Sequence, residues 1–261
     1  MCLVLLAWQQ NERSPLILAA NRDEFHARPS AAIQRWADAP QVVGGRDLLA
    51  GGTWLGATDS GRFAVVTNVR QRPAAAGSRS RGELTADFLR GNLSAADYVG
   101  TLFGQPEEAF GGYNLIVGDG REVWYYSNRE DAGCSKGRQF APGIYGLSNR
   151  FLDTPWPKLT LSRERFAEKI HGQPDPAEIL SILSDREIVP DESLPATGVP
   201  IAWERLLSAV FVCSREYGTR ASTLLTFSGG GVGMLLERTF AADGSISGET
   251  QLSLGKQPPG A

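Results

Sequence analysis

The sequence predicts an α+β fold in a single domain. Its segments run as strands, helices, strands, helices and strands, and this order differs from the strict alternation of a parallel α/β protein. The 261 residues are 42% hydrophobic and 21% charged, which is typical of a soluble protein with a sizeable core. We find no internal repeat and no linker. One domain is therefore expected over residues 1–254, followed by a frayed tail over 255–261.

The first predicted element is a buried β-hairpin. Leu3–Trp8 and Leu16–Ala20 are short apolar runs on either side of the polar stretch QQNERSP. The second strand is expected to end where the polar segment NRDEFHARP begins. The next stretch, GGRDLLAGGTWLGATDSGRFAVVTNVR, predicts a strand, a tight turn at Asp59–Gly61 and another strand.

Helices are predicted in the middle of the chain. Ser80 and Glu83 form a capping-box pattern, so a helix is expected to begin near Arg81. Its inner face would carry Leu84, Phe88 and Leu89. A second helix is expected over Ala95–Phe103.

Strands and helices then alternate in blocks. YNLIVGDGREVWYYSN predicts a hairpin and GIYGLSN another strand, whereas TPWPKLTLSRERFAEKI and PAEILSILSD have helical spacing. The last strands are expected in TRASTLLTFS, VGMLLERTF and SISGETQLSL. The glycine-rich Ser228–Gly233 joins two strands and is interpreted as a turn, not a nucleotide loop.

Composition narrows the function classes. A net charge of −3 argues against a nucleic-acid partner. The cysteines Cys2, Cys134 and Cys213 match neither a disulfide framework nor a zinc site. With only His26 and His171, a multi-histidine metal centre is excluded, and no cofactor is expected.

The apolar run that begins at Leu3 is too short for a signal peptide or a membrane span. We therefore expect a cytoplasmic protein with reduced thiols and no transmembrane segment. Cys134 and Cys213 are interpreted as structural. The sequence does not indicate an oligomeric state.

Cys2 has two interpretations. It can be an ordinary buried residue of a strand. Alternatively, removal of Met1 leaves Cys2 with a free α-amine, whose pKa is about 7.7–8.0 against about 8.5 for a thiol. Such an amine can act as the base for the adjacent thiol, which would make Cys2 an N-terminal nucleophile.

The charged cluster Asn21-Arg22-Asp23-Glu24 bears on this choice. Because the two strands of a hairpin run antiparallel, the end of the second lies beside the start of the first, and thus beside Cys2. A carboxylate there can orient an ammonium group, and an arginine can lower the pKa of a thiol. The alternative interpretation is a solvated turn.

Several blocks together resemble a known family. These are Asn21–Glu24 after an apolar strand, GGRDLLAGGTWLG, VTNVR, SRGELTADFL, GGYNL, GLSN with TPWPK, and YGTRASTLL. In this order, from residue 1 to about 225, they resemble the NRDE family, also called the transport and Golgi organization protein 2 family. The resemblance implies kinship with N-terminal-nucleophile hydrolases and their four-layered αββα sandwich of mostly antiparallel sheets.

The resemblance also implies a set of site residues. Cys2 matches the nucleophile of penicillin V acylases, bile salt hydrolases and acid ceramidase-like amidases. The implied catalytic residues are Cys2, Arg22, Asp23, Asn68, Asn149 and Arg220, with Asn68 at the oxyanion hole and Asn149 positioning the amine. Four further residues are substrate-binding candidates from their positions in the sequence: Asn21 and Glu24 in the charged cluster, Arg70, and Trp54, which would either reach a pocket wall or pack in the core at a tight bend. The spacing of Arg22 and Asp23 departs from the Arg-Asn-x-Asp pattern of that branch.

Two functions follow as hypotheses. The first is an amidohydrolase that cleaves a linear amide or thioester by acyl transfer to Cys2. The second is a non-catalytic binding or trafficking protein for an acyl lipid, acyl-CoA or haem, in line with roles in lipid or haem homeostasis that the family resemblance implies. In that version His26 could line the pocket or ligate haem iron. Arg70, Arg72, Arg79 and Arg81 crowd one loop and would either meet an anionic group or be solvated.

Overall fold

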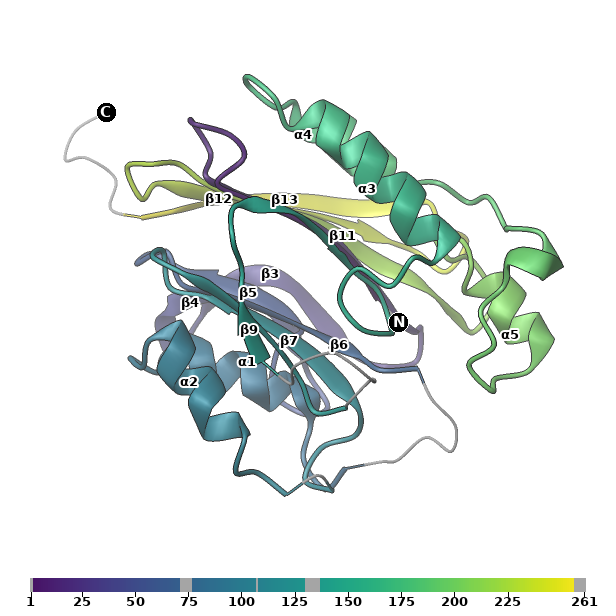
Figure 1. The fold of residues 1–261 in the computed structure, drawn as a ribbon, viewed down its shortest axis with the longest axis horizontal. Coiled ribbons are helices and arrows are strands. Elements are labelled where there is room, and N and C mark those ends of the chain that lie inside the picture. The colour runs from purple at the N-terminus through teal and green to yellow at the C-terminus, as the bar shows by residue number, and fades with distance from the viewer. Residues whose placement is uncertain (1, 71–76, 107, 130–136, 256–261) are drawn as a thin grey trace.

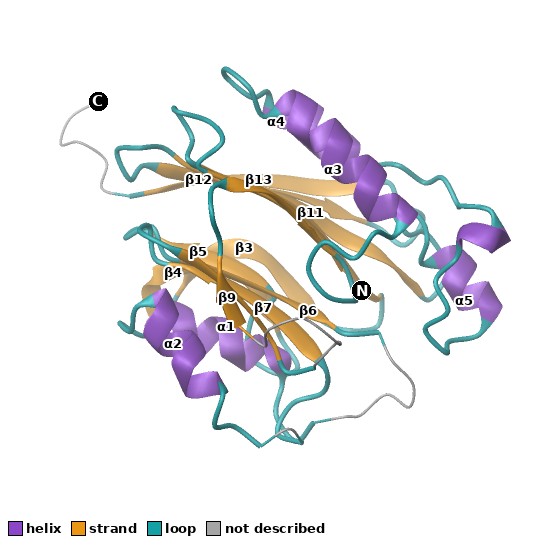
Figure 2. Cartoon of the chain, viewed as in Figure 1, coloured by secondary structure: helices purple, strands orange, loops and turns teal. Residues whose placement is uncertain are grey.

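Two antiparallel β-sheets face each other between two layers of helices, as Figures 1 and 2 show. The computed structural model describes residues 2–70, 77–106, 108–129 and 137–255. One sheet has six strands in the order β10-β1-β2-β11-β12-β13, and the other has seven in the order β3-β4-β5-β6-β7-β8-β9. The expected αββα layering is therefore confirmed.

The bounds of the elements are as follows. The six-stranded sheet contains β1 (Cys2–Trp8), β2 (Leu16–Phe25), β10 (Gly143–Leu147), β11 (Tyr217–Phe227), β12 (Gly233–Phe240) and β13 (Ile246–Leu254). The seven-stranded sheet contains β3 (Ser30–Trp36), β4 (Ala39–Asp47), β5 (Leu55–Thr58), β6 (Phe63–Asn68), β7 (Tyr113–Gly118), β8 (Val123–Ser127) and β9 (Gly137–Gln139).

Helices α1 (Arg81–Arg90) and α2 (Ala95–Leu102) cover the outer face of the seven-stranded sheet, and α3 (Pro157–Lys169) and α4 (Pro176–Ile182) cover that of the six-stranded sheet. The short α5 (Ile201–Leu206) packs near the start of β11, where Trp203 contacts Tyr217. None of the described helices is long and apolar enough to cross a membrane.

The alternation of side chains along β1 divides the core. Val4, Leu6 and Trp8 join the apolar cluster between the two sheets. Leu3 and Leu5 point the other way, into the cluster under α3 and α4. A period of two places neighbouring residues on opposite faces, so both faces of β1 are buried, as the apolar run predicts.

Most predicted elements are confirmed. The first hairpin, the turn at Asp59–Gly61, the hairpin of β7 and β8, and the last three strands are present. Ser80 caps α1 by accepting a hydrogen bond from the Gly82 N–H, and Glu83 accepts one from the Ser80 N–H at 2.9 Å. The predicted inner face of α1 is buried.

Two predictions need correction. β2 does not end before Asn21 but continues to Phe25, because β11 pairs alongside it, with Asp23 opposite Thr219. The polar cluster is thus strand, not turn. The prediction also missed β3, β9 and α5, whose few buried residues give little periodic signal, and β4, whose buried residues include two glycines and do not alternate with exposed ones. The predicted frayed tail after Gly255 lies outside the described residues.

A candidate active site at the start of the first strand

Cys2 lies at the edge of a pocket between the two sheets. It is directly opposite Arg22 in the β1–β2 ladder, as the hairpin geometry predicts. The pocket has a volume of about 400 Å³, which is within the range of small-molecule sites. Its walls come from both sheets and from the first turn of α1, and they include Cys2, Asp23, Trp54, Asn68, Arg81 and Arg220.

Two asparagines link Cys2 to the end of β6. The backbone N–H of Cys2 donates a hydrogen bond to Oδ1 of Asn149 at 3.3 Å. Nδ2 of Asn149 donates in turn to Oδ1 of Asn68 at 3.0 Å and to its carbonyl oxygen at 3.1 Å. Ser148 completes the contact, since its hydroxyl donates to the Cys2 carbonyl oxygen at 3.1 Å. One hydrogen-bond network therefore joins the start of β1, the end of β6 and the segment after β10, and Asn149 is the member that contacts the Cys2 nitrogen.

Asp23 is buried at the bottom of the site. The Thr219 hydroxyl donates to Oδ1 of Asp23 at 2.7 Å, and the Tyr217 hydroxyl donates to its carbonyl oxygen at 3.0 Å. Lys158 on α3 lies in the same buried region, where its ammonium group donates to the Leu207 carbonyl oxygen at 2.8 Å. The Lys158 charge acts electrostatically on both Asp23 and Cys2.

Burial controls ionisation at this site. It raises the pKa of the Cys2 thiol, and the negative charge of Asp23 acts in the same direction, whereas Arg22 lowers that pKa. Burial also raises the pKa of the Asp23 carboxyl, against the opposing charge of Lys158. For Lys158, burial lowers the pKa to about 8. The expected effect of Arg22 is present, but burial outweighs it.

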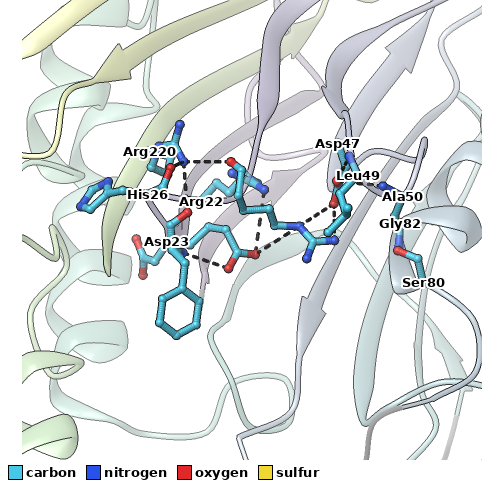
Figure 3. A network of polar contacts seen from close by, with 12 residues as sticks. Arg22, Asp23, His26, Asp47, Leu49, Ala50, Ser80, Gly82 and Arg220 are labelled. Carbon is cyan, nitrogen blue, oxygen red and sulfur yellow. Dashed lines mark hydrogen bonds and ion pairs between the residues drawn. The ribbon is translucent and has the colours of Figure 1, made fainter. Parts of the chain in front are cut away.

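A polar network ties the two sheets together at the pocket. Arg220 donates to the carbonyl oxygens of Phe25, His26 and Arg28, each at 3.2 Å. Arg28 then pairs with Asp47 at 2.6 Å. Figure 3 shows this chain of contacts, with Arg220 at one end and Asp47 at the other.

The loop after β4 packs closely on the start of α1. A Cβ atom at Gly52 would lie 2.4 Å from the backbone of Gly82, so the approach requires glycine. The Thr53 N–H donates to the Gly82 carbonyl oxygen at 3.2 Å. This contact places Trp54 and Arg81 on the same pocket wall.

Comparisons with known proteins identify the family of this chain. The sequence profile described as Transport and Golgi organisation 2 matches residues 1–242. The chain belongs to the Transport and Golgi organisation 2 family. It is 34% identical to the bovine Transport and Golgi organization protein 2 homolog, over 96% of this chain and 97% of that protein. It is 33% identical to the human homolog, over 92% of this chain and 93% of that protein.

A solved structure supports the fold of this family member. The N-acylethanolamine-hydrolyzing acid amidase ortholog of Caenorhabditis elegans superposes with a TM-score of 0.50 at 13% sequence identity, covering 86% of this chain and 92% of that one. At this identity the similarity shows the fold alone. The predicted four-layered αββα fold is therefore confirmed as a fold.

Not every predicted site residue of this family member lines the pocket. Asn21 and Arg22 are neighbours in β2, so their side chains point to opposite faces of the sheet. Nδ2 of Asn21 donates to the carbonyl oxygens of Leu183 and Val210, under the outer helices. Arg70 is buried in an ion pair with Glu204 at 2.7 Å. Glu24 does line the pocket, 3.9 Å from Arg22.

His26 lies outside the pocket of this family member. His26 makes a 3.1 Å contact with the Ser214 carbonyl oxygen and does not line the pocket, so it does not fit a haem ligand there. No group of three or more metal-ligating side chains occurs among the described residues. Cys213 is partly exposed and away from the pocket, and Cys134 and Arg72 lie outside the described residues.

The sequence interpretation missed several residues of this family site. Lys158 places a buried charge and Thr219 a hydrogen bond at Asp23, and Glu204 is the buried partner of Arg70. Lys158 stands in the TPWPK block and Thr219 in the YGTRAS block, both of which carry the resemblance. Their roles depend on contacts across helix and sheet that no local pattern reports.

Proposed function

We propose that the protein is an N-terminal-nucleophile hydrolase that cleaves a linear amide or thioester through Cys2 after Met1 is removed. The observation that carries this proposal is the hydrogen bond between the Cys2 backbone nitrogen and Asn149. Removal of Met1 would turn that nitrogen into the α-amine. The amine would then already have an acceptor, Oδ1 of Asn149, that fixes its position beside the thiol.

The residues around Cys2 suit the steps of such a reaction. The α-amine accepts the thiol proton, and the Cys2 sulfur attacks the carbonyl carbon to form a tetrahedral oxyanion. Asn68 lines the pocket together with Cys2, and its side-chain amide would stabilise that oxyanion through Nδ2. Collapse breaks the C–N or C–S bond, and the ammonium returns its proton to the leaving group.

Hydrolysis of the acyl-enzyme repeats these steps with water. The α-amine takes a proton from water, hydroxide adds to the thioester, and the Cys2 thiolate leaves and is reprotonated. Asp23, held by the Thr219 hydroxyl, supplies a negative charge that stabilises the ammonium form.

The experiment is a hydrolysis screen of short acyl p-nitroanilides and acyl thioesters with protein whose N-terminus has been verified. Cys2→Ala is expected to abolish turnover, whereas Cys213→Ser, a change away from the pocket, is expected to retain it. Equal turnover by wild-type and Cys2→Ala protein on every responsive probe would falsify the proposal.

A second candidate function is binding of an acyl compound in the same pocket without catalysis. Burial of Cys2 favours this candidate as long as Met1 is present, because it raises the pKa of the thiol and keeps it protonated. In that case Cys2→Ala leaves both ligand affinity and the absence of turnover unchanged.

A further inference from the structure

Among the described residues, some arginines that line the pocket have an acidic partner and others do not. Five arginines line it: Arg22, Arg28, Arg46, Arg81 and Arg220. Three of these have acidic partners. Arg22 lies 3.9 Å from Glu24, Arg28 pairs with Asp47 at 2.6 Å, and Arg46 pairs with Asp38 at 2.7 Å.

Arg81 and Arg220 differ from the other three. Within the described part of the chain, neither guanidinium forms an ion pair with a carboxylate. Arg220 uses its Nη1 on three carbonyl oxygens, and it thereby holds the loop after β2. The Arg220 side chain therefore holds this loop in place and is less able than Arg81 to bind a ligand.

Arg81 is the available cation of the two. Its one hydrogen bond among the described residues is from Nη1 to the Gly112 carbonyl oxygen at 3.3 Å. A guanidinium has five N–H donors, so most of those of Arg81 can bind a ligand. Arg81 is an exposed residue that lines the same pocket as Cys2. Desolvation by the surrounding protein lowers the pKa of its guanidinium, and electrostatic interaction with Cys2 acts in the opposite direction.

The acidic residues that remain in the pocket do not neutralise Arg81. Asp23 and Glu237 are each only 3% exposed. Asp23 accepts from Thr219, and Glu237 accepts from the Ile33 N–H at 2.9 Å. Both carboxylates are engaged in the walls. Glu24 acts electrostatically on Arg81, but it also lies 3.9 Å from Arg22 and 4.0 Å from Arg28 and so is shared with two other arginines.

We propose that Arg81 selects substrates that carry an anionic group, a carboxylate or a phosphate, a short distance from the bond that Cys2 attacks. This inference rests on the proposed function and names its substrate class. A planar guanidinium binds either anion through paired N–H donors. Apolar side chains such as Val66 and Phe240 are a minority of the lining, so the pocket suits a short polar acyl compound better than a long aliphatic chain.

The test uses two amides that differ in charge, glutaramate and its neutral analogue glutaramide. Each is titrated by NMR into Cys2→Ala protein, which cannot turn them over. Glutaramate is expected to bind about 10- to 100-fold more tightly, as for a hydrogen bond to a charged group. N-acetyl-O-phosphoethanolamine forms a second arm, and tighter binding of this amide than of glutaramate identifies the preferred anion as a phosphate.

Substitutions of Arg81 test whether this residue causes the tighter binding of the charged amide. Arg81→Gln, in the Cys2→Ala background, is expected to remove the charge preference, and Arg81→Lys to retain part of it. The matched control is Arg79→Gln, because Arg79 is a neighbouring exposed arginine that pairs with Glu83 at 2.9 Å and does not line the pocket. Thermal unfolding of each variant shows whether it is folded.

The outcomes separate this inference from the proposed function. Equal binding of glutaramate and glutaramide, or equal effects of Arg79→Gln and Arg81→Gln, overturns the role of Arg81 even if Cys2 is a nucleophile. A charge preference that depends on Arg81 supports the inference, even if no amide is hydrolysed and the proposed reaction fails.

Discussion

The Cys2 backbone nitrogen lies 3.3 Å from Oδ1 of Asn149, although 147 positions separate the two residues in the chain. The contact arises because β10 and β2 flank β1 on opposite sides, which places Asn149 at the start of β1 together with Arg22. After removal of Met1, an α-amine held by this buried amide oxygen would be fixed in position to act as the base that we propose. The proposed chemistry depends on this relationship more than on the pKa of the thiol.

Replacing Asn149 tests that relationship. Asn149→Ala removes the acceptor of the Cys2 nitrogen and the donor to Asn68, and we expect turnover to fall about 100- to 1,000-fold. The free energy of unfolding should fall by about 1–3 kcal/mol. Asn11→Ala is the control, because Asn11 is also a buried asparagine bonded to backbone carbonyls, but far from the pocket at the β1–β2 turn. Similar losses of turnover in both variants would contradict the role of Asn149.

Asn68 allows a separate test of the oxyanion site. Asn68→Asp keeps the size of the side chain and its acceptor for Asn149 but replaces the donating amide with a carboxylate. We expect kcat to fall about 100- to 1,000-fold with little change in KM, because the lost interaction exists only in the transition state. Steady-state kinetics on a responsive amide give the answer, and a rise in KM alone would assign Asn68 to ground-state binding.

Lys158 should set the acid limb of the pH–rate profile. Its positive charge lowers the pKa of Asp23, and removing that charge lets this pKa rise. If ionised Asp23 is required, Lys158→Met should shift the acid limb of kcat/KM upward by roughly one pH unit. The control is Lys169→Met, an exposed lysine on the same helix. An unmoved acid limb in Lys158→Met would mean that Asp23 does not titrate in catalysis.

The ion pair between Arg70 and Glu204 should contribute to stability. Both side chains are almost fully buried, 3% and 4% exposed, so loss of one partner leaves the other charge uncompensated. Glu204→Gln is expected to lower the free energy of unfolding by about 3–5 kcal/mol in urea denaturation. The exposed pair between Arg205 and Asp191 is the comparison, and Asp191→Asn should lower the free energy of unfolding far less than Glu204→Gln does, because solvent screens an exposed pair. Equal costs would show that burial does not govern these pairs.

The fold was predictable where one strand or helix carries its own pattern. β1 is a continuous apolar run, and α1 begins with a capping box, so both could be found locally. β3 has only Ile33 and Trp36 buried, and β2 continues through charged residues because β11 pairs with them. Those features depend on tertiary partners, which a window of sequence does not contain.

The candidate site was predictable in part for the same reason. The neighbourhood of Cys2 and Arg22 follows from hairpin register alone. Side chains alternate between the two faces of a strand, so Asn21, next to Arg22, points away from the pocket. The interpretation of this segment as a turn did not predict that alternation. Lys158 could not be assigned, because its partners are carbonyl oxygens 49 and 51 positions further along the chain.

The most direct test is intact-mass spectrometry of the native protein before and after reaction with an activated acyl probe. The proposed function predicts a native chain that lacks Met1 and, after reaction, gains one acyl group that maps to Cys2 and is absent from Cys2→Ala protein. A chain that retains Met1, or a verified processed chain whose Cys2 remains unmodified by every acyl probe, would contradict it.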